Sequence, residues 1–305
     1  MEIIPIGTGS AFTMNNRQTN YLIKNNGKLL LVDCGGDARH GLAALGLSYK
    51  DLDAIYISHL HADHIGGMEW ASFCSYFDPS AHKIDLYAHH SVMAPLWDKA
   101  LSAGLSSIQA KRVSLHDYFN TKPLADNDTF LFAGISADIV QCIHIVDNLS
   151  FVPSYGLMLH APESADIIYL TTDAQHNPNQ MRDFYNRATV IFQDCETTKF
   201  PSGVHAHYSE LCAQTPEIKR RMRLTHYNDN VFAKPVTTVK QLIDLYHAEL
   251  GDNKFSYETW LEGRVLDISR TRVPVLDWTD FNAADAQAKA DGFWGFVKPL
   301  ESYTF

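Results

Sequence analysis

Three histidines and one aspartate lie within the six residues His59-Leu60-His61-Ala62-Asp63-His64. This stretch follows the apolar segment 53–58, which predicts a strand buried on both of its faces. In α/β sheets, ligands bind beyond the carboxyl ends of such strands. Imidazole and carboxylate groups suit Zn²⁺, and also Mn²⁺ or Fe²⁺. The spacing therefore predicts ligands for two metal ions, and a histidine-rich surface loop that binds nothing is the less favoured alternative.

The rest of the sequence predicts the elements that hold this loop in place. Short apolar or alternating runs bounded by turn residues predict strands, and apolar residues at helical spacing predict helices. Hairpins argue against a simple parallel, doubly wound sheet, so the pattern indicates another α/β arrangement. The predicted strands are 2–6, 19–24, 28–36, 53–58, 84–89, two within 130–145, 155–161, 166–174, 188–196 and a closing strand in 292–300, and the predicted helices are 65–77, 215–223 and 236–250.

The composition excludes several classes of protein. The chain has 305 residues, of which 46% are hydrophobic and 20% charged, as in a globular protein of one large or two small domains. No apolar run approaches the roughly 20 residues that span a bilayer, and the first residues do not resemble a secretory signal, so we expect a cytoplasmic protein. The net charge of −10 argues against a protein that grips a nucleic-acid backbone. The five cysteines show no C-x-x-C spacing, which argues against a zinc ribbon.

Four stretches together resemble one known family. The HLHADH stretch resembles the signature of the metallo-β-lactamase superfamily, and GTGSA at 7–11, LLLVDCGG at 29–36 and LTHY at 224–227 are similar to motifs of its ribonuclease Z branch. The resemblance covers about residues 1–230. It implies an α/β fold, a four-layer αββα sandwich with a C-terminal extension. The implied domains are a catalytic core over 1–230, an insertion or extension over 231–290 that forms a lid or a dimer interface, and a possible closing strand of the core in 291–305.

The resemblance also implies a complete set of metal ligands. One divalent ion would be held by His59, His61 and His144, a second by Asp63, His64 and His226, and Asp173 would bridge the two. Zinc is the expected metal, with manganese or iron as alternatives.

Two divalent ions at this site would favour a hydrolytic reaction. They outweigh the charge of the aspartates, so the site attracts an anion, and they lower the pKa of bound water to about 7. The expected reaction is attack of metal-bound hydroxide on a phosphodiester, with charge on a phosphoryl oxygen stabilised by the metal. Asp63 is also expected to help position the hydroxide, and Asp33 is expected to bond to the ligand loop rather than to a metal.

The proton donor is predicted in the segment 203–208. In the ribonuclease Z branch, a histidine about 20 residues before the last ligand acts on the phosphate or the leaving group. His205 and His207 both fit this distance from His226, and we favour His205, while His207 is about as well explained as a helix cap. Asp194 or Glu196 is expected to hold the imidazole of His205 in its protonated form.

The predicted substrate is a small or cyclic nucleotide. Ribonuclease Z enzymes insert a long basic arm between the ligands that correspond to His144 and Asp173, and only 29 positions separate those residues in this chain. Arm-less members of the branch include cyclic-nucleotide phosphodiesterases. The alternatives are a hydrolase of a lactone, thioester or β-lactam, a ribonuclease Z-type tRNA 3′ endonuclease, which the missing arm disfavours, and an inactive nucleotide-binding protein. Relatives are often homodimers, so a homodimer is a further expectation.

Overall fold

The computed structural model describes residues 1–148, 150–231 and 280–305. The helix expected over 236–250, and most of the segment 231–290 that we assigned to a lid or a dimer interface, lie outside the described residues. The division into domains and the homodimer therefore stay predictions.

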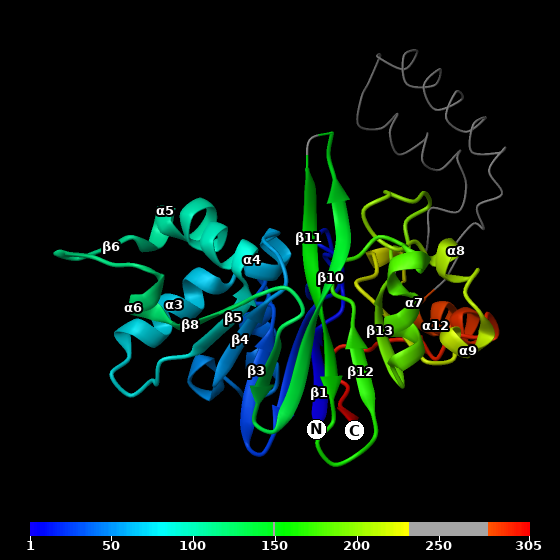
Figure 1. The fold of residues 1–305 in the computed structure, drawn as a ribbon, viewed down its shortest axis with the longest axis horizontal. Coiled ribbons are helices and arrows are strands. Elements are labelled where there is room, and N and C mark those ends of the chain that lie inside the picture. The colour runs from blue at the N-terminus through cyan, green and yellow to red at the C-terminus, as the bar shows by residue number, and fades with distance from the viewer. Residues whose placement is uncertain (149, 232–279) are drawn as a thin grey trace.

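Two seven-stranded sheets form the centre of the fold (Figure 1). Both are mixed, with antiparallel hairpins toward one side and parallel strands toward the other. The first sheet runs in the order β16 (Tyr303–Thr304), β1 (Glu2–Gly7), β2 (Asn20–Asn25), β3 (Lys28–Val32), β4 (Ala54–Ile57), β5 (Asp85–His89) and β8 (Asn120–Leu124), and the second in the order β15 (Gly295–Phe296), β14 (Met222–Thr225), β13 (Val190–Asp194), β12 (Ile167–Leu170), β11 (Phe151–His160), β10 (Ile135–Val146) and β9 (Thr129–Phe132).

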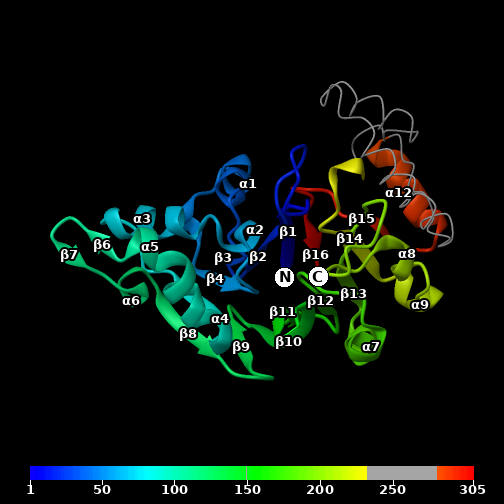
Figure 2. The same ribbon diagram turned by 90° about the horizontal axis from the view of Figure 1, so that it is seen from above.

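Helices cover the outer faces of the two sheets (Figures 1 and 2), with α3, α5 and α6 on one side and α7, α9 and α12 on the other. The predicted αββα sandwich is thereby confirmed. None of the helices in the described part of the chain has the length and apolar character to cross a membrane. The helices are α1 (Ala38–Ala44), α2 (Ala62–Ile65), α3 (Met68–Phe77), α4 (His90–Pro95), a π-helical turn (Leu96–Leu101), α5 (Ser102–Leu105), α6 (Leu115–Tyr118), α7 (Pro178–Arg187), α8 (Tyr208–Leu211), α9 (Pro216–Lys219) and α12 (Phe281–Ala290), with 3₁₀ turns at Tyr49–Asp51 and Asp229–Val231 and a small hairpin of β6 (Ser107–Ile108) and β7 (Lys111–Arg112).

The core lies between the sheets and under the outer helices. Tyr21 of the first sheet meets Phe192 of the second edge to face, with 5.7 Å between ring centroids, and all four residues of β4 are buried. On the outer side, α7 starts at the capping residue Asn177 and buries Met181 and Tyr185, which lie one turn apart on the same helix face. Two packed apolar layers thus fix the strands whose ends carry the candidate metal ligands.

Two predicted helices differ from the structure. The helix expected over 65–77 begins at residue 68, and Asp63 and His64 belong to the preceding helical turn α2 rather than to an open loop. Gly66 and Gly67 separate the two, and Gly67 N donates to the carbonyl of Cys34 at 2.8 Å. The helix expected over 215–223 ends at residue 219, because 222–225 pair with β13 as the parallel strand β14.

The C-terminal segment is joined to the second sheet around Arg223. The Arg223 guanidinium lies 3.7 Å from the ring centroid of Trp294 and 4.3 Å from that of Tyr303. Such cation–π contacts strengthen when they are removed from water, and Arg223 is buried. The stack fastens the chain after α12 to β14, the strand that directly precedes the candidate ligand His226.

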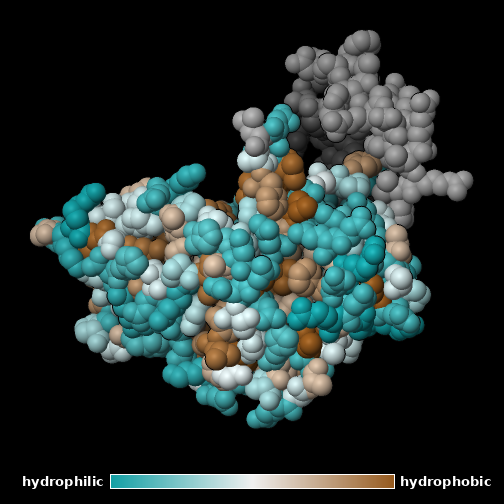
Figure 3. All heavy atoms as spheres, viewed as in Figure 1, coloured by the Kyte–Doolittle hydropathy of each residue, from teal (hydrophilic) through white to brown (hydrophobic). Residues whose placement is uncertain are grey.

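The hairpin of β10 and β11 extends beyond the rest of the sandwich (Figure 1). Three apolar side chains near its turn are exposed: Val146, Phe151 and Val152. They belong to the apolar patch at the projecting end of the hairpin (Figure 3). His144 lies at the base of the same projection, two residues before Val146.

Candidate metal centre

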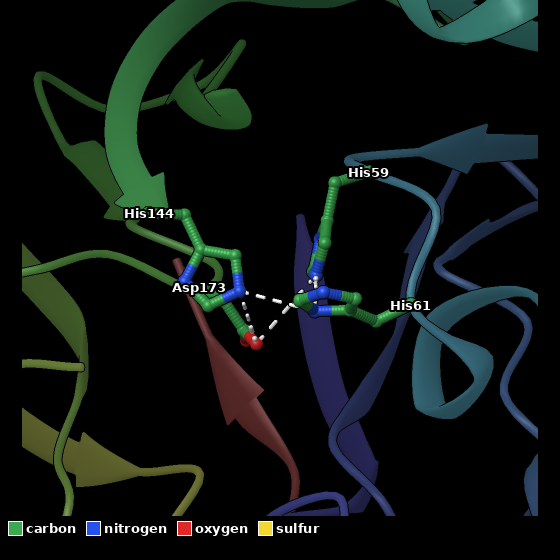
Figure 4. A group of neighbouring side chains, drawn as sticks. All are labelled: His59, His61, His144 and Asp173. Atoms are coloured by element: carbon green, nitrogen blue, oxygen red, sulfur yellow. Dashed lines mark hydrogen bonds and ion pairs between the residues drawn. The ribbon is translucent and has the colours of Figure 1, made fainter. Parts of the chain in front are cut away.

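Four side chains from distant parts of the chain converge in a first ligand group, formed by His59, His61, His144 and Asp173 (Figure 4). His61 Nδ1 lies 2.9 Å from His59 Nε2 and 3.1 Å from His144 Nε2. Asp173 Oδ2 lies 3.7 Å from each of His59 Nε2 and His144 Nε2. Ligand atoms bound to tetrahedral Zn²⁺ at 2.0–2.1 Å lie about 3.3 Å apart, so these separations fit one ion.

A second group lies next to the first and consists of Asp63, His64, Asp173 and His226. His64 Nε2 lies 3.2 Å from Asp63 Oδ2 and 3.2 Å from Asp173 Oδ1. His226 Nε2 lies 3.3 Å from the same two oxygens. All four residues are buried, and their spacing again fits the edges of a tetrahedron.

Asp173 belongs to both groups, with one carboxylate oxygen for each. Its Oδ2 faces His59 and His144, and its Oδ1 faces His64 and His226. A carboxylate placed in this way can bridge two ions. The structure therefore brings together all seven of the residues predicted as ligands.

Strand ends of both sheets position these residues. His59 and His61 follow β4 of the first sheet, whereas Asp173 and His226 follow the parallel strands β12 and β14 of the second. His144 reaches the site by a β-bulge: the β10–β11 register shifts between residues 143 and 145, which leaves His144 outside the regular pairing. Bulges commonly re-aim a side chain next to an active site.

The backbone is strained at three places in the centre. Asp33, Thr172 and His226 have φ values of 62°, 53° and 59°, in the left-handed region that is costly for residues other than glycine. Thr172 is β-branched and directly precedes the bridging aspartate. Strain of this kind persists where the surrounding structure imposes it, and it clusters at functional sites.

Buried hydrogen bonds orient the imidazoles. Asp33 Oδ2 lies 2.7 Å from His64 Nδ1, and the same carboxylate accepts from the backbone and hydroxyl of Ser58. The structure thus places Asp33 beneath the ligand loop, as expected. Ser58 and the carbonyl of Val204, which lies 2.8 Å from His144 Nδ1, were not predicted. A serine directly before the first ligand is a usable signal, whereas a main-chain carbonyl leaves none in the sequence.

The charges of the centre are arranged for cations. Burial lowers the pKa of His59 well below its usual value, and it also lowers the pKa of His144, so both rings are neutral and free to bind a metal. Burial acts in the same direction on His64, but the carboxylates of Asp173, Asp33 and Asp63 outweigh it and hold its pKa well above the usual value. Without an ion, the second group thus keeps a proton among its carboxylates, and a bound cation would replace it.

The buried aspartates of the centre are a second reason why this set of donors fits divalent ions. Asp33, Asp63, Asp173 and Asp194 are all buried, and in the described part of the chain their ion-pair partners are histidines only. His64 Nε2 is buried at 3.2 Å from both Asp63 Oδ2 and Asp173 Oδ1, yet it forms no hydrogen bond of good geometry with either. Buried charges are costly unless they are paired or bind metal, so this arrangement fits divalent cations.

The two candidate proton donors, His205 and His207, have different surroundings in the structure. His205 Nδ1 lies 2.8 Å from Asp194 Oδ2, and its ring stacks on that of His226 with 4.7 Å between centroids. His207 is buried at the start of α8, where Nδ1 accepts from Ser209 N and Nε2 lies 2.8 Å from the carbonyl of Thr198. Both ring nitrogens of His207 are therefore engaged, Nδ1 in capping α8 and Nε2 with the carbonyl of Thr198, and only His205 belongs to the cluster.

The two predicted anchors of His205 also have different roles. Asp194 holds His205, as expected, and accepts from Ala174 N. The oxygens of Glu196 accept instead from Thr198 Oγ1 and from the backbone and hydroxyl of Ser202. The alternative that Glu196 holds the imidazole is corrected accordingly: it ties down the loop that precedes His205.

The close approach of Gly35 to the ligand helix gives a first testable prediction. A Cβ at Gly35 would lie 1.9 Å from the carbonyl oxygen of Asp63, so alanine must displace α2. We expect Gly35→Ala to lower turnover by about 10²-fold, since displacements near 1 Å at an active site have effects of this size. Bound metal per chain, measured by mass spectrometry, should fall with it. Gly36→Ala is the matched control, because its Cβ would meet its nearest atom at 3.4 Å; equal effects in both variants would contradict the prediction.

A cavity opens beside the second ligand group. It has about 430 Å³ of empty space, part of which is open solvent, and is lined by His205, His226, Val204 and residues of the loop after β1. A substrate in this cavity would contact the ring of His205 and the edge of the metal centre together.

Comparison with known proteins gives consistent matches. The sequence model of the family described as "Anti-Pycsar protein Apyc1" matches residues 1–244. A protein of that name from Paenibacillus xerothermodurans is 32% identical over 234 residues, which are 76% of this chain and 89% of the relative. Among solved structures, the metallo-beta-lactamase fold protein YhfI from Bacillus subtilis matches with a TM-score of 0.58 and 18% identity over 74% of this chain and 86% of its own. Zn²⁺-bound PqqB from Methylobacterium extorquens matches with a TM-score of 0.60 and 13% identity over the whole of both chains. These structures confirm the metallo-β-lactamase fold.

Proposed function

The chain belongs to the Anti-Pycsar protein Apyc1 family, and from this premise we propose that it is a binuclear metal-dependent phosphodiesterase that hydrolyses small cyclic nucleotides. The observation that carries the proposal is the placement of Asp173, whose two oxygens face two separate ligand groups. A pair of adjacent divalent ions is the arrangement found in many phosphatases and nucleases.

The residues assigned to the metals are those of the two groups. His59, His61 and His144 would hold one ion and Asp63, His64 and His226 the other, with Asp173 shared. Zinc is the metal that best suits this set of nitrogen and oxygen donors. When bound, the ions would supply a water of lowered pKa and positive charge for the phosphoryl oxygens. Asp63 is assigned to orient the attacking water in addition to holding the second ion.

His205 is assigned as the proton donor to the leaving oxygen. Asp194 engages Nδ1, so Nε2 is the nitrogen left for a substrate in the cavity that His205 lines. Burial lowers the pKa of His205, but the carboxylates of Asp194 and Asp173 outweigh it and raise the pKa above the usual value. This shift favours the protonated ring, the state that a general acid needs.

The lining of the cavity and the short interval between His144 and Asp173 support a small phosphodiester. The cavity combines apolar side chains such as Phe12 and Val204 with the polar groups of His205 and Asn228, the mixed lining of a small-molecule site. The described residues between His144 and Asp173 form the β10–β11 hairpin, the connection to β12 and the strand end before Asp173, and they include no arm that could grip tRNA.

Hydrolysis assays with metal analysis on the same sample test the proposal. We expect turnover of 3′,5′-cyclic mononucleotides or cyclic dinucleotides to exceed that of precursor tRNA, a chromogenic lactone and a cephalosporin. We also expect two metal ions per chain, and loss of activity on dialysis against a chelator that Zn²⁺ or Mn²⁺ restores. Preferred turnover of the lactone or cephalosporin would instead assign a carbonyl substrate, and metal-free protein that binds nucleotides without cleaving them would indicate an inactive binding protein.

A further inference from the structure

The loop after β1 places an aromatic ring at the mouth of the cavity beside the metal centre. Phe12 lines this cavity together with Ser10, Asn228 and the two histidines His205 and His226. Its side chain is 88% exposed, so the ring is not part of the core. A single exposed apolar residue needs no explanation by itself, but one that faces a cavity next to two site histidines does.

The loop that carries Phe12 is held firmly although its ring is free. Asp229 accepts from Thr13 Oγ1 at 2.5 Å, from Met14 N at 2.6 Å and from Asn15 N at 3.1 Å. The carbonyl of Tyr227 accepts from Ser10 N at 3.1 Å. The loop is thereby tied on both sides of Phe12 to the residues directly after the ligand His226. A ring presented by a fixed loop loses little freedom when a ligand stacks on it.

We propose that Phe12 is the stacking platform for the nucleobase of the substrate, with Ser10 and Asn228 at the edge of the base. This inference rests on the proposed function, because it places the phosphate at the metal centre and the base in the adjoining cavity. Every nucleobase has a π face, so stacking gives affinity without selecting the base.

Selection between bases falls to the polar groups of the same cavity. Asn228 Nδ2 donates to Ser10 Oγ at 3.3 Å, and Asn228 Oδ1 accepts from Thr197 N at 3.0 Å. The Ser10 hydroxyl then keeps its proton to donate to a base nitrogen or carbonyl, because a hydroxyl both accepts and donates. Val204 supplies an apolar wall in the same cavity.

Steady-state kinetics of the metal-loaded Phe12→Ala variant test the inference. The substrates are 3′,5′-cyclic AMP, 3′,5′-cyclic CMP and methyl ribofuranoside 3,5-cyclic phosphate, which has the same phosphodiester but no base. We expect KM for both nucleotides to rise about tenfold or more, the effect of losing a base–aromatic stack, with kcat within about threefold. KM for the base-free substrate should not change, and Phe12→Trp should restore the affinity for nucleotides.

Met14→Ala is the matched control. Met14 lies on the same loop with the same exposed fraction of 88%, yet it does not line the cavity, so its loss should leave all kinetic constants unchanged. An unchanged KM in Phe12→Ala, or an equal rise for the base-free substrate, would overturn the assignment.

A binding measurement distinguishes failure of this inference from failure of the proposed function. Calorimetric titration with the Rp phosphorothioate of cyclic AMP, which resists hydrolysis, should show at least tenfold weaker binding to Phe12→Ala than to the unaltered protein. If the unaltered protein bound this analogue through Phe12 but cleaved no phosphodiester, the proposed function would fail while the stacking role stood. If it cleaved the base-free substrate and the nucleotides with equal KM, the proposed function would stand and the stacking role would fail.

Discussion

Replacing Asp173 by alanine is expected to lower phosphodiester turnover by about 10³-fold or more, because charge stabilisation and activation of water would be lost together. The carboxylate is the one group that both sets of ligands share, with a different oxygen directed at each. The variant should also bind fewer than two metal ions per chain. Elemental analysis and initial rates on a cyclic nucleotide check the two effects in the same preparation.

The control for this variant is Asp183→Ala. Asp183 lies on an exposed face of α7, so the substitution removes the same group from the same half of the fold without touching the site. Circular dichroism should show that both variants are folded. If Asp173→Ala kept two ions and more than a tenth of the activity, the shared role of this carboxylate would be wrong.

His205→Gln is expected to lower kcat on a cyclic nucleotide by about 10²- to 10⁴-fold, the range that general acid catalysis contributes. The test depends on the leaving group. The ribose oxygen that departs from a cyclic nucleotide must be protonated, whereas p-nitrophenolate departs readily as an anion. With bis-p-nitrophenyl phosphate the loss should therefore shrink to less than about tenfold. Equal losses on both substrates would mean that His205 serves the structure of the centre rather than the transfer of a proton.

His207→Asn distinguishes the two histidines that fit the predicted distance from His226, of which the sequence favours His205. Asparagine is a good helix cap and can replace the interaction of His207 with the start of α8. We expect turnover within about threefold of the unaltered protein, with about 1–3 kcal/mol lost from the free energy of unfolding, because the carbonyl of Thr198 loses its contact with Nε2. Loss of turnover in this variant, with full turnover in His205→Gln, would exchange the two roles.

The candidate ligand set could be predicted because four of its members lie close together in the sequence. These four fall within six residues after a strand whose residues are all apolar, and such a strand must be buried. The remote candidates His144, Asp173 and His226 each follow or interrupt a strand of the second sheet. The resemblance was needed to select them among the 15 histidines of the chain, because no local feature distinguishes them.

Other parts of the centre depend on contacts that no local pattern contains. The helical turn α2 forms because His64 N and Ile65 N donate to the carbonyl of His61, a backbone arrangement that the HxHxDH spacing does not reveal. Met222 and Arg223 were assigned to a helix because the preceding residues have helical spacing, yet pairing with β13 makes them strand. Asp229 reads as an ordinary turn residue, and only the fold shows that it holds the loop of Phe12.

The way in which the ligands are divided between the sheets has a mechanical consequence. His59 and His61 of the first group come from the first sheet and His144 and Asp173 from the second, while Asp63 and His64 face His226 and Asp173 in the same two-and-two manner. Each ion would thus link the two sheets to each other at the edge of the sandwich. A ligand that binds only the folded state adds to its stability. Removal of metal would therefore weaken the contact between the two sheets first, and the resistance of the chain to proteases would rise with the metal concentration around it.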